Sequence, residues 1–358
     1  MKADRRPNKF YNKRAAWCGL IAVGVLGILE SFARLSADPV LNFVRAERAL
    51  HCLGDETVYI FLCADQRIDF KHPAGFAYRV TTNHAGERTA YPDADETIEQ
   101  IDAADNANES ARDLTRPAVW IIGDSIAMGF GNSDRATFAS LLARQQPEYY
   151  IRNLGVDALG ACGIRYVFQK ALKNSASQNP RDVIWILNPS DYTDDLRDQA
   201  RSSSVIRRDA FRARFYVTKY FAFPDYLRAL IAPDPTNDDN RLPIKSDAVA
   251  PPTESDHPTF QCTREIFQIA ESLRRATGSR FTLLVYPDVD HATGKPLATD
   301  PLKAPIIALA REFPAVGVLD LQEYFERNAD LGLYLRGDGH PGPAAQWLFT
   351  LGVQRIFD

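Results

Sequence analysis

The chain has 358 residues, of which 45% are hydrophobic and 25% are charged, so it can form one enlarged α/β domain with additional segments. Its formal net charge of −4 gives no overall basic field, and we therefore expect no nucleic-acid partner.

The N-terminus is basic and then apolar, a pattern that predicts a membrane segment. Residues 1–14 contain six basic side chains, and residues 15–29 form an almost uninterrupted apolar run before Glu30. Since basic flanks stay in the cytoplasm, we expect a cytoplasmic tail at 1–14 and a single-pass anchor at 15–35. The rest of the chain would lie on the exported, periplasmic or extracellular side. A signal peptide cleaved near the small residues of Ser31-Phe32-Ala33 is the alternative.

The cysteines fit an exported protein. Cys18 lies inside the apolar run, and the remaining four are Cys52, Cys63, Cys162 and Cys262. The spacing of Cys52 and Cys63 suits a local bridge, which would leave Cys162 with Cys262, whereas four buried free thiols are the alternative. No C-x-x-C pair or Cys/His cluster is present, so we expect neither a metal nor a cofactor.

Residues 36–116 precede the main fold. They contain two expected strands, at 57–62 and 76–82, followed by the turn Asn83-His84-Ala85-Gly86-Glu87-Arg88. We expect His84 and Arg88 to be solvated in this turn. Residues 93–109 include seven acidic and no basic side chains, which predicts a flexible surface loop.

Strands and helices alternate from residue 117 to residue 358. The expected strands lie at 119–122, 150–153, 183–187, 281–286 and 316–320. The expected helices lie at 138–144, 166–173, 265–275, 305–313 and 344–357. This order predicts an α/β fold of three layers, α/β/α, with a five-stranded, flavodoxin-like parallel sheet. Ligands of such sheets bind outside the carboxyl ends of the strands.

Residues 201–259 form an insertion in this pattern. Its first half interleaves basic with aromatic residues, and its second half is rich in proline. The basic and aromatic half is suited to a membrane surface or to a lid over the site. The interpretation we prefer is an ordinary helix whose aromatic side chains point inward and whose arginines are solvated.

Two short stretches carry the candidate chemistry. Gly123-Asp124-Ser125 and Gly129 follow the first strand of the alternating pattern, which places the Ser125 hydroxyl at the start of a helix. Near the end of the chain, Asp338 stands two residues before His340 in a loop. A serine nucleophile requires a base of this kind and an acid that orients the base.

These stretches resemble the SGNH hydrolases, also called the GDSL-like lipase and acylhydrolase family, in particular its exported, membrane-anchored members. The resemblance implies Ser125 as nucleophile, His340 as base and Asp338 as orienting acid. The family usually places its acid three residues before the histidine, where this chain has Gly337, but some exported members have the Asp-Gly-His-Pro found here.

The resemblance also points to an oxyanion hole. The backbone N–H of Ser125 is one expected donor. Asn153-x-Gly155 keeps the opening of the second family motif, but Ala158 stands where the family has its oxyanion glycine, with Gly160 as the fallback. In the third motif, direct alignment puts Ser190 at the position of the family's asparagine. Asn188 lies two residues earlier, and we prefer it for its amide donors.

The sequence therefore predicts an exported serine esterase or O-acyltransferase, which acts on acyl groups of a carbohydrate or envelope polymer. The acetyl group and the carbohydrate are implied by the resemblance to exported family members. A second hypothesis is a catalytically inactive SGNH-like domain that binds a glycan or a partner. The departures in the third motif keep this hypothesis open.

Overall fold

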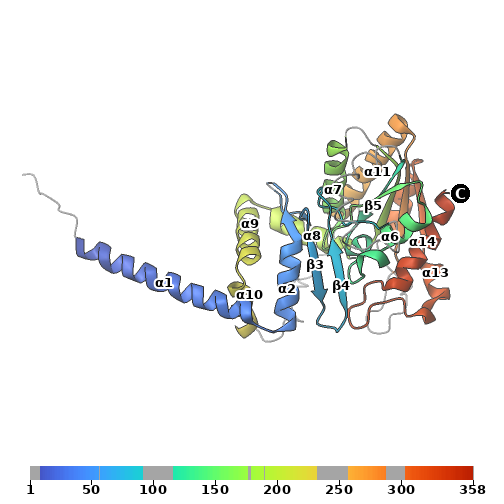
Figure 1. The fold of residues 1–358 in the computed structure, drawn as a ribbon. Helices are drawn as coiled ribbons and strands as arrows, with labels where there is room; N and C mark the ends of the chain where they lie inside the picture. Colours follow the sequence, from blue (N-terminus) through green and yellow to red (C-terminus); the bar gives the residue numbers. More distant parts are fainter. Residues whose placement is uncertain are drawn as a thin grey trace, which may run out of the picture.

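Five parallel strands form the central sheet of the computed structural model, which describes residues 9–55, 57–91, 116–175, 179–188, 190–231, 257–287 and 303–357 (Figure 1). The strand order is β6-β5-β7-β8-β9. The strands are β5 (Ala118–Gly123), β6 (Tyr150–Asn153), β7 (Pro180–Leu187), β8 (Arg280–Val285) and β9 (Val316–Asp320). The predicted flavodoxin-like sheet is confirmed, because the first strand lies second in the order and all five strands are parallel.

Helices cover both faces of this sheet, because successive side chains of each strand point to opposite sides. Trp120 lies in the hydrophobic cluster on one face and Ile121 in the cluster on the other. The first face is covered by α7 (Ala161–Asn174), α11 (Pro258–Thr277) and α12 (Lys303–Arg311). The second is covered by α6 (Phe138–Gln145), α13 (Gln322–Arg327) and α14 (Pro343–Phe357). This is the predicted α/β/α arrangement.

The segment before the sheet shares its core with the α/β domain. It contains α2 (Pro39–Leu50) and two antiparallel strand pairs, β1 (His51–Leu53) with β2 (Ile60–Leu62) and β3 (Arg67–Lys71) with β4 (Ala77–Thr81). Phe43, Leu62, Phe70 and Tyr78 belong to the same hydrophobic cluster as Trp120. The division of the chain at residue 117 stays a prediction, and the acidic stretch 93–109 lies outside the described residues.

The N-terminal helix α1 (Lys9–Leu35) projects away from the body (Figure 1). Its part Trp17–Leu35 is long and apolar enough to cross a membrane, with a mean hydropathy of 1.8. The end of the helix is joined to the body. Glu30 accepts hydrogen bonds from the backbone N–H groups of Ala222 and Phe223 at 3.0 and 2.9 Å, and Ala33 is buried.

The insertion forms two of the helices that follow α8 (Asp191–Ser202), namely α9 (Val205–Tyr220) and α10 (Phe223–Ile231). The preferred interpretation of this segment is wrong in part. Phe215 points inward, but Tyr220 and Phe221 are exposed. Arg212 is half-buried and donates to the carbonyl oxygens of Gly54 and Thr57, so it is not fully solvated. The proline-rich half of the insertion lies outside the described residues up to residue 256.

Two disulfides join the four cysteines of the body. Cys52 is bonded to Cys63 and Cys162 to Cys262, which is the pairing suggested by the spacing and not the alternative of free thiols. The first bridge joins β1 to the residue that follows β2, and the second joins α7 to α11 on one face of the sheet.

Removal of the Cys162–Cys262 bridge is expected to destabilise the protein more than removal of the Cys52–Cys63 bridge. The two loops span 100 and 11 residues, and loop-closure entropy gives about 4.7 kcal/mol for a loop of ~100 residues and about 3 kcal/mol for one of ~15. Urea denaturation of the two double cysteine-to-alanine variants measures the difference. Equal losses in the free energy of unfolding would contradict this order.

Candidate active site

The turn after β5 presents the Ser125 hydroxyl at the carboxyl edge of the sheet. Gly123 has φ +149°, and a Cβ atom there would lie 2.8 Å from the carbonyl oxygen of Ile186, so the turn requires glycine. The Asp124 carboxylate accepts from the Ile126 N–H at 2.9 Å and caps the short helix α5 (Ser125–Met128). Ser125 is thereby fixed at the first position of a helix.

Ser125, His340 and Asp338 form one hydrogen-bonded chain. The Ser125 Oγ lies 2.9 Å from Nε2 of His340, and Nδ1 of His340 lies 2.5 Å from Oδ1 of Asp338. The backbone N–H of His340 also donates to Asp338 Oδ1 at 3.1 Å. With Nδ1–H directed at the carboxylate, Nε2 is free to accept the serine proton. The structure thus brings together the three residues that the sequence motifs single out, although Ser125 and His340 are 215 residues apart in the chain.

The charges of this chain suit a base and its orienting acid. Burial alone would lower the pKa of His340, but the hydrogen bond and charge of Asp338, with smaller effects of Asp124 and Asp157, raise it above its ordinary value. Burial would raise the pKa of Asp338, but the hydrogen bonds and charge of His340 hold that pKa below its usual range. Asp338 is therefore ionised at neutral pH, whereas His340 titrates above the usual histidine range.

A second histidine faces the other oxygen of Asp338. Nε2 of His72 lies 3.4 Å from Asp338 Oδ2. Nδ1 of His72 accepts from the Ala74 N–H at 3.1 Å, so its proton resides on Nε2 and faces the carboxylate. The ring stacks on Phe76 at 4.3 Å. His72 thus fixes the position of Asp338 from the segment that precedes the sheet.

Arg88 holds the loop that follows the nucleophile. The expectation of a solvated Arg88 is wrong, because only 1% of the residue is exposed, whereas His84 in the same turn is exposed and paired with Asp65. The Arg88 guanidinium donates to the Asp134 carboxylate and to the carbonyl oxygens of Arg79, Met128, Gly129 and Asn132. The carbonyls of Met128, Gly129 and Asn132 belong to the end of α5 and to the turn before the helix η2 (Asp134–Ala136), so one cation holds the whole loop and ties it to Arg79 of β4.

The loop after β6 lies directly against the nucleophile turn. Val156 donates to the Gly123 carbonyl at 3.2 Å, and a Cβ atom on Gly155 would lie 2.2 Å from the Met128 nitrogen. Ala158, at the position of the family's oxyanion glycine, has φ +55°. An alanine therefore adopts the left-handed conformation that glycine favours.

Two contacts hold this unusual backbone. His51 Nε2 pairs with the carboxylate of Asp157, the neighbour of Ala158, and Arg197 donates to the Ala158 carbonyl at 2.7 Å. Gly160 lies farther along the loop at the start of α7. A Cβ atom there would be 2.4 Å from a carboxylate oxygen of Asp195. The Gly160 backbone therefore packs closely against α8.

Asn188 and Ser190 both lie beside the nucleophile, at the end of β7. The Asn188 amide donates to Asp124 Oδ2 at 2.6 Å and to the Ser190 hydroxyl at 2.8 Å. The Ser190 hydroxyl donates to the same carboxylate at 3.3 Å, and this carboxylate lies 3.4 Å from Ser125 Oγ. Both candidate side-chain donors therefore bind the same Asp124 carboxylate that lies next to Ser125.

Helix α8 presents carboxylates to the interior. Asp191 is fully buried, and burial together with the charges of Asp124 and Asp195 raises its pKa well above the usual value. Burial also raises the pKa of Asp194 to about 7 and that of Asp195 to about 6. Asp195 accepts from the Cys162 N–H at 2.9 Å and the Thr259 hydroxyl at 2.6 Å, so it joins α8 to α7 and α11.

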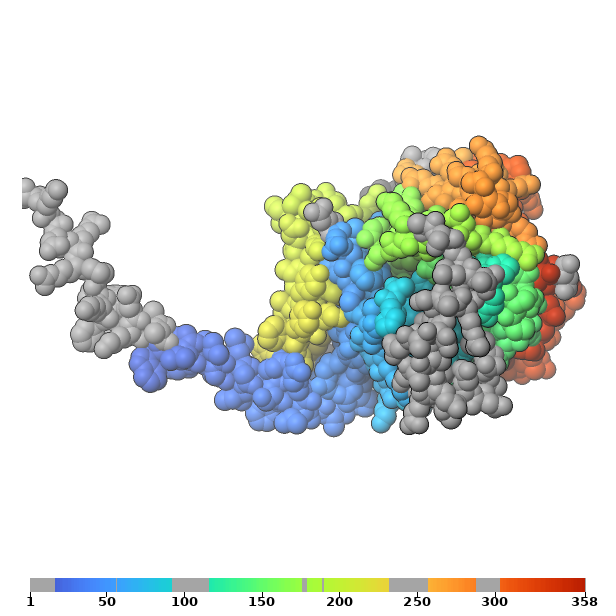
Figure 2. Space-filling model, turned by 45° about the horizontal axis from the view of Figure 1, so that its top comes forward, coloured from blue at the N-terminus to red at the C-terminus, as the bar shows by residue number. Residues whose placement is uncertain are grey.

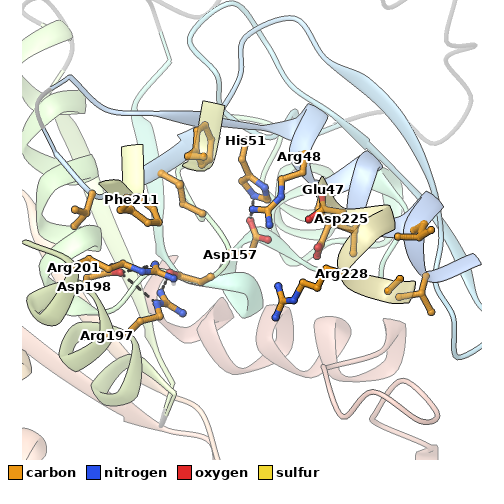
Figure 3. A pocket seen from close by; sticks show the side chains of 18 of the residues that line it. Glu47, Arg48, His51, Asp157, Arg197, Asp198, Arg201, Phe211, Asp225 and Arg228 are labelled. Carbon is orange, nitrogen blue, oxygen red and sulfur yellow. Dashed lines mark hydrogen bonds and ion pairs between the residues drawn. The ribbon is translucent and has the colours of Figure 1, made fainter. Parts of the chain in front are cut away.

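A cavity of about 330 Å³ adjoins Asp157 and Ala158 in the loop after β6 (Figure 3). Figure 3 shows the His51–Asp157 pair near its centre, Arg197 and Arg201 on one side, and Arg228 of α10 on the other. Its lining also includes apolar and further charged side chains, among them Leu41, Val44, Glu47, Arg48, Asp198, Phe211, Phe215 and Asp225. Burial and the charge of Asp157 raise the pKa of Glu47 to about 7.

No sequence motif indicated His51, His72 or Glu47 as neighbours of the site. Each lies in the segment before the sheet, far from both motifs, and only the folded chain brings them to Asp157 and Asp338. The spacing of the carboxylates of α8, in contrast, could be read from the sequence. Asp191, Asp194, Asp195 and Asp198 are spaced at i, i+3, i+4 and i+7, which places them on one face of a helix.

The fold and the site define an α/β protein with a serine, histidine and aspartate chain at the carboxyl edge of a parallel sheet. No family model matches the sequence, and no curated protein matches it either. Several solved structures overlap with it at low scores. They include a lipolytic protein of the G-D-S-L family from Veillonella parvula DSM 2008 (11% identity, 67% of this chain and 97% of that chain, TM-score 0.38).

Two further similar structures are esterases. One is a psychrotrophic esterase from a Pseudoalteromonas species (11% identity, 67% of this chain and 96% of that chain, TM-score 0.38). The other is a catalytic mutant of an acetylxylan esterase from Geobacillus stearothermophilus (12% identity, 67% of this chain and 93% of that chain, TM-score 0.36). Because the sequence identities and the TM-scores are low, the function proposed below depends on the side chains of the site.

Replacement of Arg88 by alanine is expected to lower the free energy of unfolding by about 3–5 kcal/mol, because Asp134 would remain buried without its cation. The matched control is Arg79→Ala. Because Asp69, the partner of Arg79, is exposed, this substitution should lower the free energy of unfolding by only about 0–1 kcal/mol. Urea denaturation compares the two variants. Similar small losses for both would show that Arg88 does not hold the loop.

Proposed function

We propose that this protein is a serine esterase in which Ser125 attacks an acyl ester. The observation that carries the proposal is the hydrogen-bonded chain from Ser125 through His340 to Asp338, at 2.9 and 2.5 Å. Such a chain removes the serine proton as the oxygen attacks a carbonyl carbon, and it returns that proton to the leaving alcohol.

The reaction proceeds in two halves. In the first, the Ser125 oxygen forms a bond to the acyl carbon, and His340 takes the hydroxyl proton and passes it to the departing alkoxide. In the second, water or another alcohol attacks the acyl-serine, His340 takes its proton, and Ser125 leaves with that proton restored. Asp338 stays ionised and stabilises the imidazolium of both halves.

The oxyanion formed in each half needs hydrogen-bond donors near Ser125. We assign the backbone N–H groups of Ser125 and Ala158 and the side chain of Asn188 to this role. The left-handed conformation of Ala158 and the contacts that hold it support the second donor. The Asn188 amide, which now donates to Asp124 and to the Ser190 hydroxyl, would be the third donor by exchanging the Ser190 hydroxyl for the oxyanion.

The proposed substrate is an acetyl ester of a carbohydrate or envelope polymer. The resemblance of the motifs to exported SGNH proteins suggests it, and the cavity supports it. Carbohydrates are neutral and polar. The cavity, whose lining includes Asp157 and Ala158 but not Ser125 or His340, offers charged groups such as Arg48 and the ring of Phe211. Transfer of the acetyl group to a second alcohol follows the same two halves and is included in the proposal.

The proposed location is the exported face of a membrane, with α1 as an uncleaved anchor. Glu30 and Ala33 support retention of the helix, because the first caps α10 and the second is buried against the body. Cleavage of a signal peptide next to Ala33 would remove both contacts. The two disulfides fit an oxidising compartment outside the cytoplasm.

Ser125→Ala is expected to abolish turnover of nitrophenyl acetate and of acetylated glycans, since loss of a nucleophile lowers the rate by several powers of ten. His340→Ala should have about the same effect, and the control Ser272→Ala, on the exposed side of α11, should have none. If the folded wild-type protein turns over no ester, it is a non-catalytic domain that binds a glycan or a partner.

The rate is expected to fall in acid at a pH above the ordinary histidine pKa of about 6.5, because His340 must be neutral to act as base and its pKa is raised. Asp338→Asn removes the main interaction that favours the imidazolium, so the acid limb of kcat/KM should move to lower pH. The pH profiles of both enzymes measure the shift. An unchanged acid limb would assign the titration to another group.

Asn188→Ala is expected to lower kcat by roughly two to three powers of ten with little change in KM, because an oxyanion donor acts only in the transition state. Ser190→Ala should then be mild. The reverse ranking would place the side-chain donor at Ser190. Two mild effects would leave only the backbone donors, and kinetics on nitrophenyl acetate distinguish the three outcomes.

A further inference from the structure

Helices α9 and α10 carry an exposed apolar surface that neither the sheet nor the cavity uses. We call it the outer face of the insertion. It consists of Tyr216, Val217, Tyr220, Phe221, Leu227, Leu230 and Ile231, each of which is at least 40% exposed. Large apolar side chains that gather in this way on a surface usually mark a site of interaction.

Helical geometry separates the outer face of α10 from its inner face. Asp225, Arg228 and Ala229 line the cavity, whereas Leu227 and the pair Leu230–Ile231 are exposed. At 100° per residue these two sets point in nearly opposite directions. All the charged residues of α10 lie on the cavity side, and the outer face has none.

Helix α9 is divided in the same way. Phe211 and Phe215 line the cavity, and Tyr216, Val217 and Tyr220 point to the opposite side. The inner side is tied to the body. Besides the bonds of Arg212, the Lys219 ammonium donates to the carbonyl oxygen of Arg48 at 3.0 Å. These bonds fix α9 against the body, and its outer side is exposed in the part of the chain that the structure describes.

The outer face continues the apolar surface of α1. The Arg34 guanidinium donates to the Tyr220 carbonyl at 3.0 Å, and Glu30 caps the first turn of α10. Figure 1 shows α9 and α10 on the side of the body from which α1 projects, with α9 running across the direction of α1. In Figure 2 their yellow surface meets the blue surface of α1. A membrane crossed by α1 would therefore lie against this side.

We propose that the outer face of the insertion rests in the interfacial layer of the lipid bilayer that α1 spans. The chemistry of the face fits this layer, since Tyr216 and Tyr220 combine an apolar ring with a polar hydroxyl and the remaining members are apolar. The body is then held by α1 and by a helical surface that lies flat on the membrane.

This arrangement places the cavity beside the bilayer. Helix α10 has the membrane on its outer face and the cavity on its inner face, so the two are separated by one helix diameter of about 10 Å. If the proposed function holds, the enzyme acts on acyl groups carried at the membrane surface. The docking itself does not depend on catalysis.

The test uses the full chain with Cys18→Ala, reconstituted at one copy in each phospholipid nanodisc. One variant carries Leu230→Cys and the control carries Leu331→Cys, each labelled with the environment-sensitive fluorophore NBD. The two positions are 63% and 55% exposed, so differences in emission report the surroundings and not burial in the protein. Leu331 lies in η5 (Ala329–Leu331), away from the insertion.

NBD at residue 230 is expected to emit at shorter wavelength than NBD at residue 331, and phospholipids with nitroxide-labelled acyl chains should quench it several-fold more strongly. Adding Leu227→Glu and Ile231→Glu should abolish that quenching, while the chain stays in the nanodisc through α1. Equal emission and equal quenching at residues 230 and 331 would overturn the proposal, as would a chain that does not enter the nanodisc. One copy per disc prevents a second copy from protecting the label.

Discussion

The buried cation of Arg88 is the contact on which the candidate site depends. A guanidinium in the interior must have acceptors for its N–H groups, and here they come from the Asp134 carboxylate and from backbone carbonyls around the nucleophile loop. The loop cannot move without leaving a charge unpaired. Because Arg88 belongs to the segment before the sheet, this contact also makes that segment a structural part of the site.

The same segment supplies the surroundings of Asp338 and of the loop after β6. His72 faces the second oxygen of Asp338, and His51 pairs with Asp157 next to the left-handed Ala158. An α/β sheet can place Ser125 and His340 at its carboxyl edge, but the sheet does not provide these two histidines. Strands β1 to β4 therefore complete a site that begins with the strand β5.

The amphipathic helix α10 of the insertion links the cavity beside the site to the N-terminal helix α1. Asp225 and Arg228 of α10 line the cavity, and the backbone at the start of the same helix is held by Glu30 of α1. A charged residue near the end of an apolar helix is costly unless it has partners, and Glu30 finds them in two backbone N–H groups. The interruption of the apolar run thus has a structural cause.

The sequence by itself determined the sheet, its five strands, the Ser125 turn and the Asp338–His340 loop, because periodicity and glycine turns depend on neighbouring residues. It also suggested the disulfide pairing that the structure contains. Only the tertiary structure decided the burial of Arg88, the roles of His51 and His72, the conformation of Ala158 and the exposure of Tyr220. Each of these follows from contacts between segments far apart in the chain. The local sequence pattern does not specify which distant surface a side chain will contact.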